Sequence, residues 1–442
     1  MATSADGNDD FFKKDTPHGL VKRFMWKKHV QTFIPRTQQS RCYITTIIFD
    51  GFAGAGRYGS KNEWPDEIEK FGSPLISLKV AINFHLASFR RNTKQYNAYS
   101  FNAKINIPHF IVKDLSYVSN FHKFHCEKIQ LYFVERNKKN YNKLVNNVIA
   151  LFRKHDINVN ISKNGNEIFV TSSDKNIPVG CKIINACFED VEVPIMGKRD
   201  IMTSFIDPYG YTQIPMKKIK DFTGTSKEVF INLMTQHINR FKDVGSQGLE
   251  KLFGLKHRDI LKRLDNYQDD GLIERFAKLY IDVLEEKTDV KYHLSFEMRN
   301  KGNVPLFHMI FASKHEAGFN SMKEAMNRGT QSQGAFSVSE YLIVKKNQKL
   351  SWGNDQNDEH VAYTIYQEFK GVVDVSFADI KNFIMFETIF VWRTKPLKIL
   401  EIERRLMECF YTKKEEEEND RRRGTYNDEK YEFTFDFENR DF

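Results

Sequence analysis

The chain has 442 residues, 40% hydrophobic and 28% charged, enough for one large or two medium-sized globular domains. A formal net charge of +9 and a pI near 9.0 favour an anionic partner, with nucleic acid first. No apolar run reaches the ~20 residues that cross a bilayer, and the five cysteines lack the spacing of a disulfide framework or a metal site. These features predict an intracellular protein, cytoplasmic or nuclear, with no membrane partner.

Residues 1–20 are polar and hold no signal-peptide core, so they are expected to be a disordered leader. From residue 21 to 330, strand-like and helix-like patterns alternate, which predicts an α/β domain with a mostly parallel sheet. Strands are expected at 43–50, 128–135, 157–161 with 180–190, 201–208, 228–234 and, as a hairpin, 289–313. The main crossover helices are expected at 72–89 and 137–155. Seven strands ending in a hairpin predict a Rossmann-like sheet of the methyltransferase type.

Two insertions interrupt this domain, at about 90–127 and 236–287, and the second is helical, basic and amphipathic. A polar stretch after Asn327 predicts a linker. Residues 340–442 then show three short helical patterns followed by a strand, the order of a winged helix. The mixed charge run at 413–424 is expected to be a solvated loop.

The stretch "FDGFAGAGRYG" follows the first strand and is the first candidate site. Asp50 ends the strand, and Gly54 and Gly56 allow the backbone to approach a ligand closely. A following helix would direct free N–H groups towards a carboxylate or phosphate. Because Phe52 and Ala53 precede the glycines, the pattern favours the methionine part of S-adenosylmethionine over a pyrophosphate.

Acidic residues at two later strand ends complete the expected cofactor site. Glu135 follows the second strand, where an acid accepts hydrogen bonds from ribose hydroxyls. Its distance from the glycines exceeds the usual spacing, and the insertion at 90–127 accounts for the excess. Glu189 ends the third expected strand, where a contact with adenine is predicted. A surface position is the alternative for each acid.

The stretch "SFIDPYGYTQIP" at 204–215 predicts the substrate side of the site. Methyltransferases that act on exocyclic amines use a D/N-P-P-Y/F loop, in which the acid and a carbonyl hold the amine and the aromatic ring stacks on the base. Here Asp207, Pro208 and Tyr209 are followed by glycine, so either Tyr209 or Tyr211 could be the stacking ring. A plain Pro-Gly turn is the alternative.

These motifs together resemble the three-Cys-motif partner family, through "KKHVQTF", "FDGFAGAGRYG", "GSPL", "YFVERN", "FIDPYGYTQIP", "VFINLMTQHINR" and "HMIFASKHEAGFNSMKEAM". The resemblance covers roughly residues 20–330 and implies a methyltransferase fold and a protein partner that carries three cysteines. Members usually have D-P-F-G where Tyr209 stands, and the acid of their third strand is displaced here.

The sequence therefore predicts an S-adenosylmethionine-dependent methyltransferase that acts on a nucleic-acid base or nucleotide amine, on DNA or RNA. The alternative is a catalytically inactive methyltransferase fold that binds nucleic acid or a protein partner, since a fold does not guarantee an activity. A dinucleotide-dependent oxidoreductase is a third hypothesis, which the Asp-Pro loop disfavours.

Overall fold

The computed structural model of the protein describes residues 17–39, 42–58, 71–92, 128–235, 238, 246–267, 271–299, 305–331, 338–345, 348–351, 358–388, 390–411, 426 and 431–435. The expected leader up to residue 16, most of the first insertion, the hairpin turn at Asn300 to Asn303, the end of the expected linker and the charge run at 413–424 lie outside these residues. The described chain forms two compact units, one of residues up to 293 with 297–336 and one of 294–296 with 337–442.

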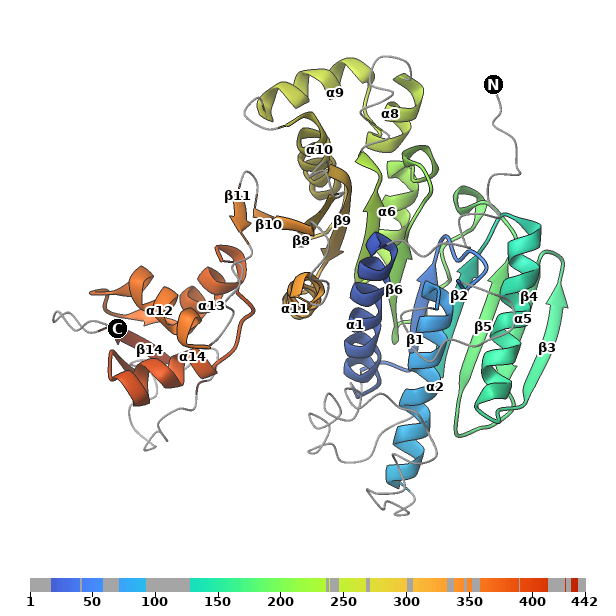
Figure 1. Ribbon diagram of the computed structural model, residues 1–442, viewed down its shortest axis with the longest axis horizontal. Coiled ribbons are helices and arrows are strands. Elements are labelled where there is room, and N and C mark those ends of the chain that lie inside the picture. Colours follow the sequence, from blue (N-terminus) through green and yellow to red (C-terminus); the bar gives the residue numbers. More distant parts are fainter. Residues whose placement is uncertain are drawn as a thin grey trace. The chain divides into compact units, whose positions relative to one another are not determined.

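The first unit is built on a large mixed sheet, so the expected α/β class is confirmed (Figure 1). Its strand order is β8-β9-β7-β6-β1-β2-β5-β4-β3. The strands are β1 (Thr45–Asp50), β2 (Lys128–Val134), β3 (Val159–Asn164), β4 (Glu167–Ser172), β5 (Val179–Ile184), β6 (Asp200–Ile206), β7 (Glu228–Leu233), β8 (Tyr292–Arg299) and β9 (Pro305–Ser313). Strands β5, β2, β1, β6 and β7 run parallel, and β9 pairs antiparallel with β7.

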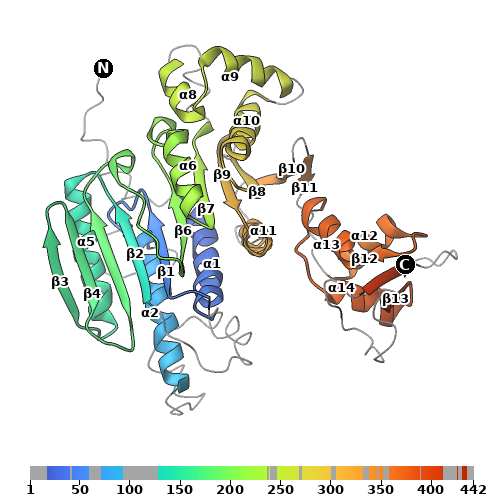
Figure 2. The same cartoon turned by 180° about the vertical axis from the view of Figure 1, so that it is seen from behind.

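Helices cover both faces of this sheet, which is why its central strands are continuously apolar. One face carries α1 (Pro17–Gln39), α2 (Ser73–Asn92), α5 (Lys138–Lys154) and α11 (Glu316–Gln331). The other carries α6 (Met216–Thr225), α8 (Ser246–Phe253), α9 (His257–Leu264) and α10 (Leu272–Lys287) (Figure 2). The apolar side chains of these helices share one core with Phe49 and Ile231. Alternate strand residues thus face different helix layers.

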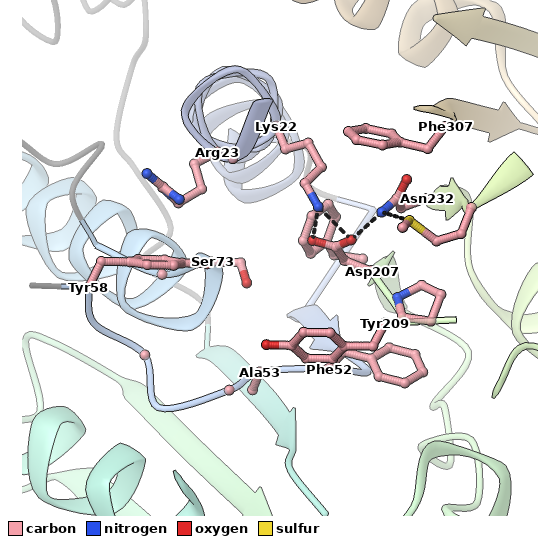
Figure 3. A pocket seen from close by; sticks show the side chains of 17 residues that line it. Lys22, Arg23, Phe52, Ala53, Tyr58, Ser73, Asp207, Tyr209, Asn232 and Phe307 are labelled. Carbon is pink, nitrogen blue, oxygen red and sulfur yellow. Dashed lines mark hydrogen bonds and ion pairs between the residues drawn. The ribbon is translucent and has the colours of Figure 1, made fainter. Parts of the chain in front are cut away.

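Helix α1 is fixed to the sheet by buried polar contacts. Its His29 ring contacts the Thr203 hydroxyl at 2.9 Å, and Gln38 donates to Thr46 at 2.8 Å. Trp26 stacks on Phe205 with ring centroids 4.7 Å apart. Figure 3 shows Lys22, in the first turns of α1, directed towards Asp207, which follows β6.

Three expected boundaries are corrected by the structure. The leader was predicted to reach residue 20, but α1 begins at Pro17. Residues 157–161 were grouped with the third strand, but β3 and β4 form a separate antiparallel hairpin beyond β5, so the described sheet of this unit exceeds the seven expected strands. The expected linker begins inside α11, which continues to Gln331.

The second unit is small and has its own apolar core of mostly helical residues. Its elements are the hairpin β10 (Val338–Lys345) and β11 (Gln348–Ser351), then α12 (Asp358–Phe369), β12 (Val375–Ser376), α13 (Phe377–Phe386), α14 (Lys395–Lys398), the π-helical turn Ile399–Arg404, β13 (Met407–Tyr411) and β14 (Tyr431–Phe435). The last three strands form a separate sheet in the order β12-β14-β13. Ser376 and Asp379 form a reciprocal capping box that starts α13.

Candidate functional site

A cavity of about 220 Å³ lies beyond the carboxyl ends of β1, β6 and β7 (Figure 3). The chain runs from β1 outward to β2 and β5, then returns to β6 on the other side of β1, so the strand order reverses here. Such a reversal leaves a crevice where open α/β sheets bind ligands. The lining comes from six parts of the chain, within 19–23, 52–58, 72–73, 205–209 and 232–234, and Phe307.

The glycine loop after β1 forms one wall of the cavity. Gly54 and Gly56 have φ angles of 61° and 78°, the left-handed region that side chains disfavour. A Cβ on Gly56 would lie 2.8 Å from the Leu144 side chain. The Gly72 N–H donates to the Gly56 carbonyl at 2.8 Å, which ties the loop to the start of α2. The glycines are therefore required by the backbone and bring it to the cavity surface.

Asp50 lies fully buried at the end of β1, next to this wall. Its Oδ1 accepts from the Phe52 N–H at 3.1 Å, and a hydrogen bond from the Ser73 side chain at the start of α2 also acts on the carboxyl group. Burial raises the pKa of Asp50 to about 7, and the nearby charges of Asp207 and Glu135 add to the rise. The site thus contains a carboxyl group that can change charge near neutral pH.

Asp207 follows β6 and is held by groups from two other elements. Lys22 Nζ of α1 lies 2.8 Å from both carboxylate oxygens, and Asn232 Nδ2 of β7 donates to Oδ1 at 2.6 Å. The Lys22 and Asp207 side chains are 17% and 23% exposed. Figure 3 shows this cluster between α1 and the ends of β6 and β7.

Aromatic rings line much of the remaining surface. Tyr209 and Phe52 line the side opposite α1, and Tyr58 and Ser73 line another part of the wall (Figure 3). The Arg23 guanidinium is stacked 4.2 Å from the Tyr58 ring, and Lys22 Nζ is 5.2 Å from the Phe307 ring. Rings and cations of this kind suit a planar, partly anionic ligand such as a nucleotide.

The structure brings most of the predicted site residues to this one cavity. Residues that line it include Phe52, Ala53, Gly54, Gly56, Asp207, Pro208 and Tyr209. Glu135 is outside the lining; its carboxylate accepts from the Asn137 N–H at 2.6 Å at the start of α5. Burial raises the pKa of Glu135, although the Asn137 and Gly54 N–H groups oppose the rise.

Two predicted site residues lie elsewhere. Tyr211 is buried at 6% exposure and its ring lies close to Gly248 of α8, so Tyr209 is the ring that reaches the cavity. Glu189 is exposed on the single turn Phe188–Asp190 and does not line the cavity. Phe188 of the same turn is buried against Gly51 and Phe52, which aims the turn's apolar side inward and the acid outward.

Sequence reasoning missed Lys22, Arg23 and Asn232. Lys27 and His29, farther along α1, are buried and do not line the cavity. Lys22 lies seven residues, or about two helical turns, before His29, so the two residues share one face of α1. The sequence around Asn232 does not indicate a functional role, because an amide within a buried apolar strand can also serve only to stabilise the fold.

The described residues contain no group of three or more His, Cys, Asp or Glu side chains that could hold a metal ion. Among the helices of the described ranges, none is long and apolar enough for a membrane crossing.

Comparisons with known proteins leave the chain unassigned. No family model matches it, and no curated protein matches it. Among solved structures it is similar to protein LPL1258 from Legionella pneumophila, described with the family model DUF519, at 9% identity and a TM-score of 0.36. The likeness covers 73% of this chain and 95% of that one, and at this TM-score it supports no assignment.

Proposed function

We propose that the protein is an S-adenosylmethionine-dependent methyltransferase related to the three-Cys-motif partner family, acting on an amine of a nucleic-acid base or nucleotide. One observation carries the proposal: the glycine loop after β1 and the Asp207-Pro208-Tyr209 loop after β6 line the same cavity. A methyl donor and its acceptor must lie side by side, because alignment is the main catalytic requirement for an activated methyl group.

The sheet supports this proposal. Its parallel strands β5, β2, β1, β6 and β7 are followed by the consecutive strands β8 and β9, of which β9 runs antiparallel. This is the terminal hairpin on which the sequence prediction of a methyltransferase sheet rested. The β3–β4 hairpin extends the outer edge and leaves the carboxyl ends of β1 and β6 accessible to a ligand.

The residues present fit the proposed cofactor. Asp50 offers a buried carboxyl group next to the glycine loop, which can accept from an ammonium group. The Gly56 backbone and the start of α2 at Ser73 offer N–H groups to a carboxylate. Phe52 and Tyr58 offer rings. When bound, S-adenosylmethionine supplies a methyl group already activated by its sulfonium charge.

On the substrate side, Tyr209 is placed to stack on a base and Asp207 to order the polar groups around the amine. Tyr209 is 40% exposed, so a ring that enters from solvent can cover it. A base within a duplex would first have to leave its stack.

Calorimetric titration with S-adenosylmethionine tests the proposal. Gly54→Val should abolish binding, since it adds a branched side chain at φ 61°, whereas Asp207→Ala should retain it. Gly165→Val is the matched control, because Gly165 has φ 57° in the β3–β4 turn with no atom within 4 Å of an added Cβ. If wild-type protein fails to bind the cofactor at millimolar concentration, the enzyme proposal is wrong for the isolated chain.

A second candidate is an inactive methyltransferase fold that binds nucleic acid or a protein partner. The observation that favours it is the Lys22 ammonium at 2.8 Å from both Asp207 oxygens, which occupies the acid expected to receive the amine. Cofactor binding without transfer of a labelled methyl group to DNA, RNA or nucleotides would support this candidate over the enzyme.

The second unit supports a nucleic-acid partner under either candidate. Its three helices and the sheet β12-β14-β13 have the element order expected of a winged helix. Exposed basic residues surround the third helix, namely Arg393, Lys395, Lys398, Arg404 and Arg405. Some are neutralised by Asp358 and Glu359, while Lys398 and Arg405 have no ion pair among the described residues.

A further inference from the structure

Asn232 lines the cavity near the end of β7 and is fully buried. Its Nδ2 donates to Asp207 Oδ1 at 2.6 Å and lies 3.4 Å from the Met234 sulfur. The reversed amide would place its oxygen against a carboxylate oxygen, so electrostatics fixes the orientation. Figure 3 shows the amide nitrogen directed at Asp207 and the oxygen directed away from it.

This orientation leaves the amide oxygen without a role inside the protein. Asn232 Oδ1 is buried and accepts no hydrogen bond from any described residue. Buried acceptors are nearly always paired, so such an atom in a cavity wall indicates a missing donor. An adjacent strand residue, Ile231, packs into the core on the opposite face, which confirms that the amide belongs to the cavity side.

Asp207 is a poorer acceptor for a hydrogen bond from such a ligand donor. Both of its oxygens already accept from Lys22, and Oδ1 also accepts from Asn232. Its charge is balanced by the Lys22 ammonium. The Asp207 carboxylate is therefore engaged by its neighbours, whereas Asn232 Oδ1 accepts no hydrogen bond from a described residue.

We propose that Asn232 is a specificity-determining residue whose Oδ1 accepts a hydrogen bond from the exocyclic amine of the substrate base. The inference rests on the proposed function and names the substrate class as amino-bearing nucleobases, such as adenine and cytosine. Asp207 acts as a positioning residue that holds the amide, and Lys22 neutralises Asp207. A base with a carbonyl in place of the amine would oppose two oxygens and is rejected.

Binding of nucleosides to the protein saturated with S-adenosylhomocysteine tests this assignment. Wild type should bind adenosine over inosine, or cytidine over uridine, by about tenfold or more. Asn232→Leu should bring the ratio to near one and leave the affinity for S-adenosylhomocysteine unchanged. Met234→Leu, which removes the other acceptor of the amide nitrogen, should retain the preference.

Exchanging the side chains of residues 207 and 232 distinguishes the role of Asn232 from that of Asp207. Asn232→Asp combined with Asp207→Asn keeps an acceptor at 232 and moves the amide donor to 207, so it should restore the amine preference that Asn232→Leu loses. Preference retained in Asn232→Leu, or no nucleoside binding by the loaded wild type, would overturn the inference. Failure of S-adenosylhomocysteine to bind would instead reject the proposed function itself.

Discussion

Lys22 and Asp207 are 185 positions apart in the chain, yet the Lys22 ammonium lies 2.8 Å from each oxygen of the Asp207 carboxylate. The contact joins the first described helix to the loop after β6 and forms the wall that closes the cavity beneath α1. It therefore links the stability of α1 to the arrangement of the substrate loop.

We expect Lys22→Met to lower the free energy of unfolding by about 1–2 kcal/mol, because it leaves a part-buried carboxylate with only the Asn232 donor. Asp207→Asn should lower the free energy of unfolding less in the Lys22→Met background than in the wild type. Urea denaturation of the four proteins measures this coupling. Lys28→Met, the same change farther along α1, is the control, and additive effects would contradict the prediction.

Asp50 should give stability a distinct pH dependence. Its pKa is about 7 in the folded protein and 3.8 in the unfolded chain. Between these pH values the carboxyl group is therefore protonated in the folded protein and ionised in the unfolded chain. Unfolding then releases a proton, and stability falls as pH rises through this window by up to about 1.4 kcal/mol per pH unit. Asp50→Asn should lack this fall.

The measurement for Asp50 is the difference in unfolding free energy between wild type and Asp50→Asn. The free energy of unfolding of wild type, relative to that of Asp50→Asn, should fall as pH rises from ~4 to ~7 and stay level above that range. A difference that is constant across the range would show that Asp50 does not hold a proton in the folded protein.

A second prediction for α1 concerns its other end, where Arg36 donates to Glu228 of β7. Glu228 is 3% exposed, and burial raises its pKa in spite of Arg36. Arg36→Met should lower stability by about 2–3 kcal/mol, because it leaves a buried carboxyl without its cation. Adding Glu228→Gln should recover most of that loss in thermal or urea denaturation. A double variant no more stable than Arg36→Met would refute this explanation.

In the second unit, Lys398→Ala with Arg405→Ala should weaken binding of the full chain to duplex DNA. Each lost phosphate contact should also reduce the slope of log affinity against log salt by about one. Fluorescence anisotropy between about 50 and 200 mM salt measures both effects. Lys163→Ala with Lys175→Ala removes the same charge from exposed positions of the first unit. Equal losses in the two double variants would point to nonspecific attraction.

The sequence predicted the central strands well, because a strand buried on both faces must be continuously apolar. Residues 45–50 are the clearest case, and Asp50 breaks the run at the strand end where a ligand group is expected. A strand was predicted at 157–161, where Ile157, Val159 and Ile161 alternate with asparagines, but its pairing with β4 was not. Because β3 is largely exposed, burial does not show which strand it pairs with.

Some residues of the candidate site could be predicted from the sequence and others could not, again for a physical reason. Gly54 and Asp207 could be predicted because each belongs to a local motif that a few neighbouring residues define. Lys22 and Asn232 could not, since their importance arises only from contacts across the sheet. Glu189 was placed by its position near a strand end, but the side of its turn was set by the burial of Phe188.

The cavity also bears on the protein's synthesis. Its walls begin at Gly19 and end at Phe307, and β9, which carries Phe307, pairs with the inner strand β7. A nascent chain can form β1 and its glycine loop early, but the enclosure is complete only after residue 307 has left the ribosome. Ligand capture at this cavity therefore has to wait for β9, whereas the last hundred or so residues are not needed to line it.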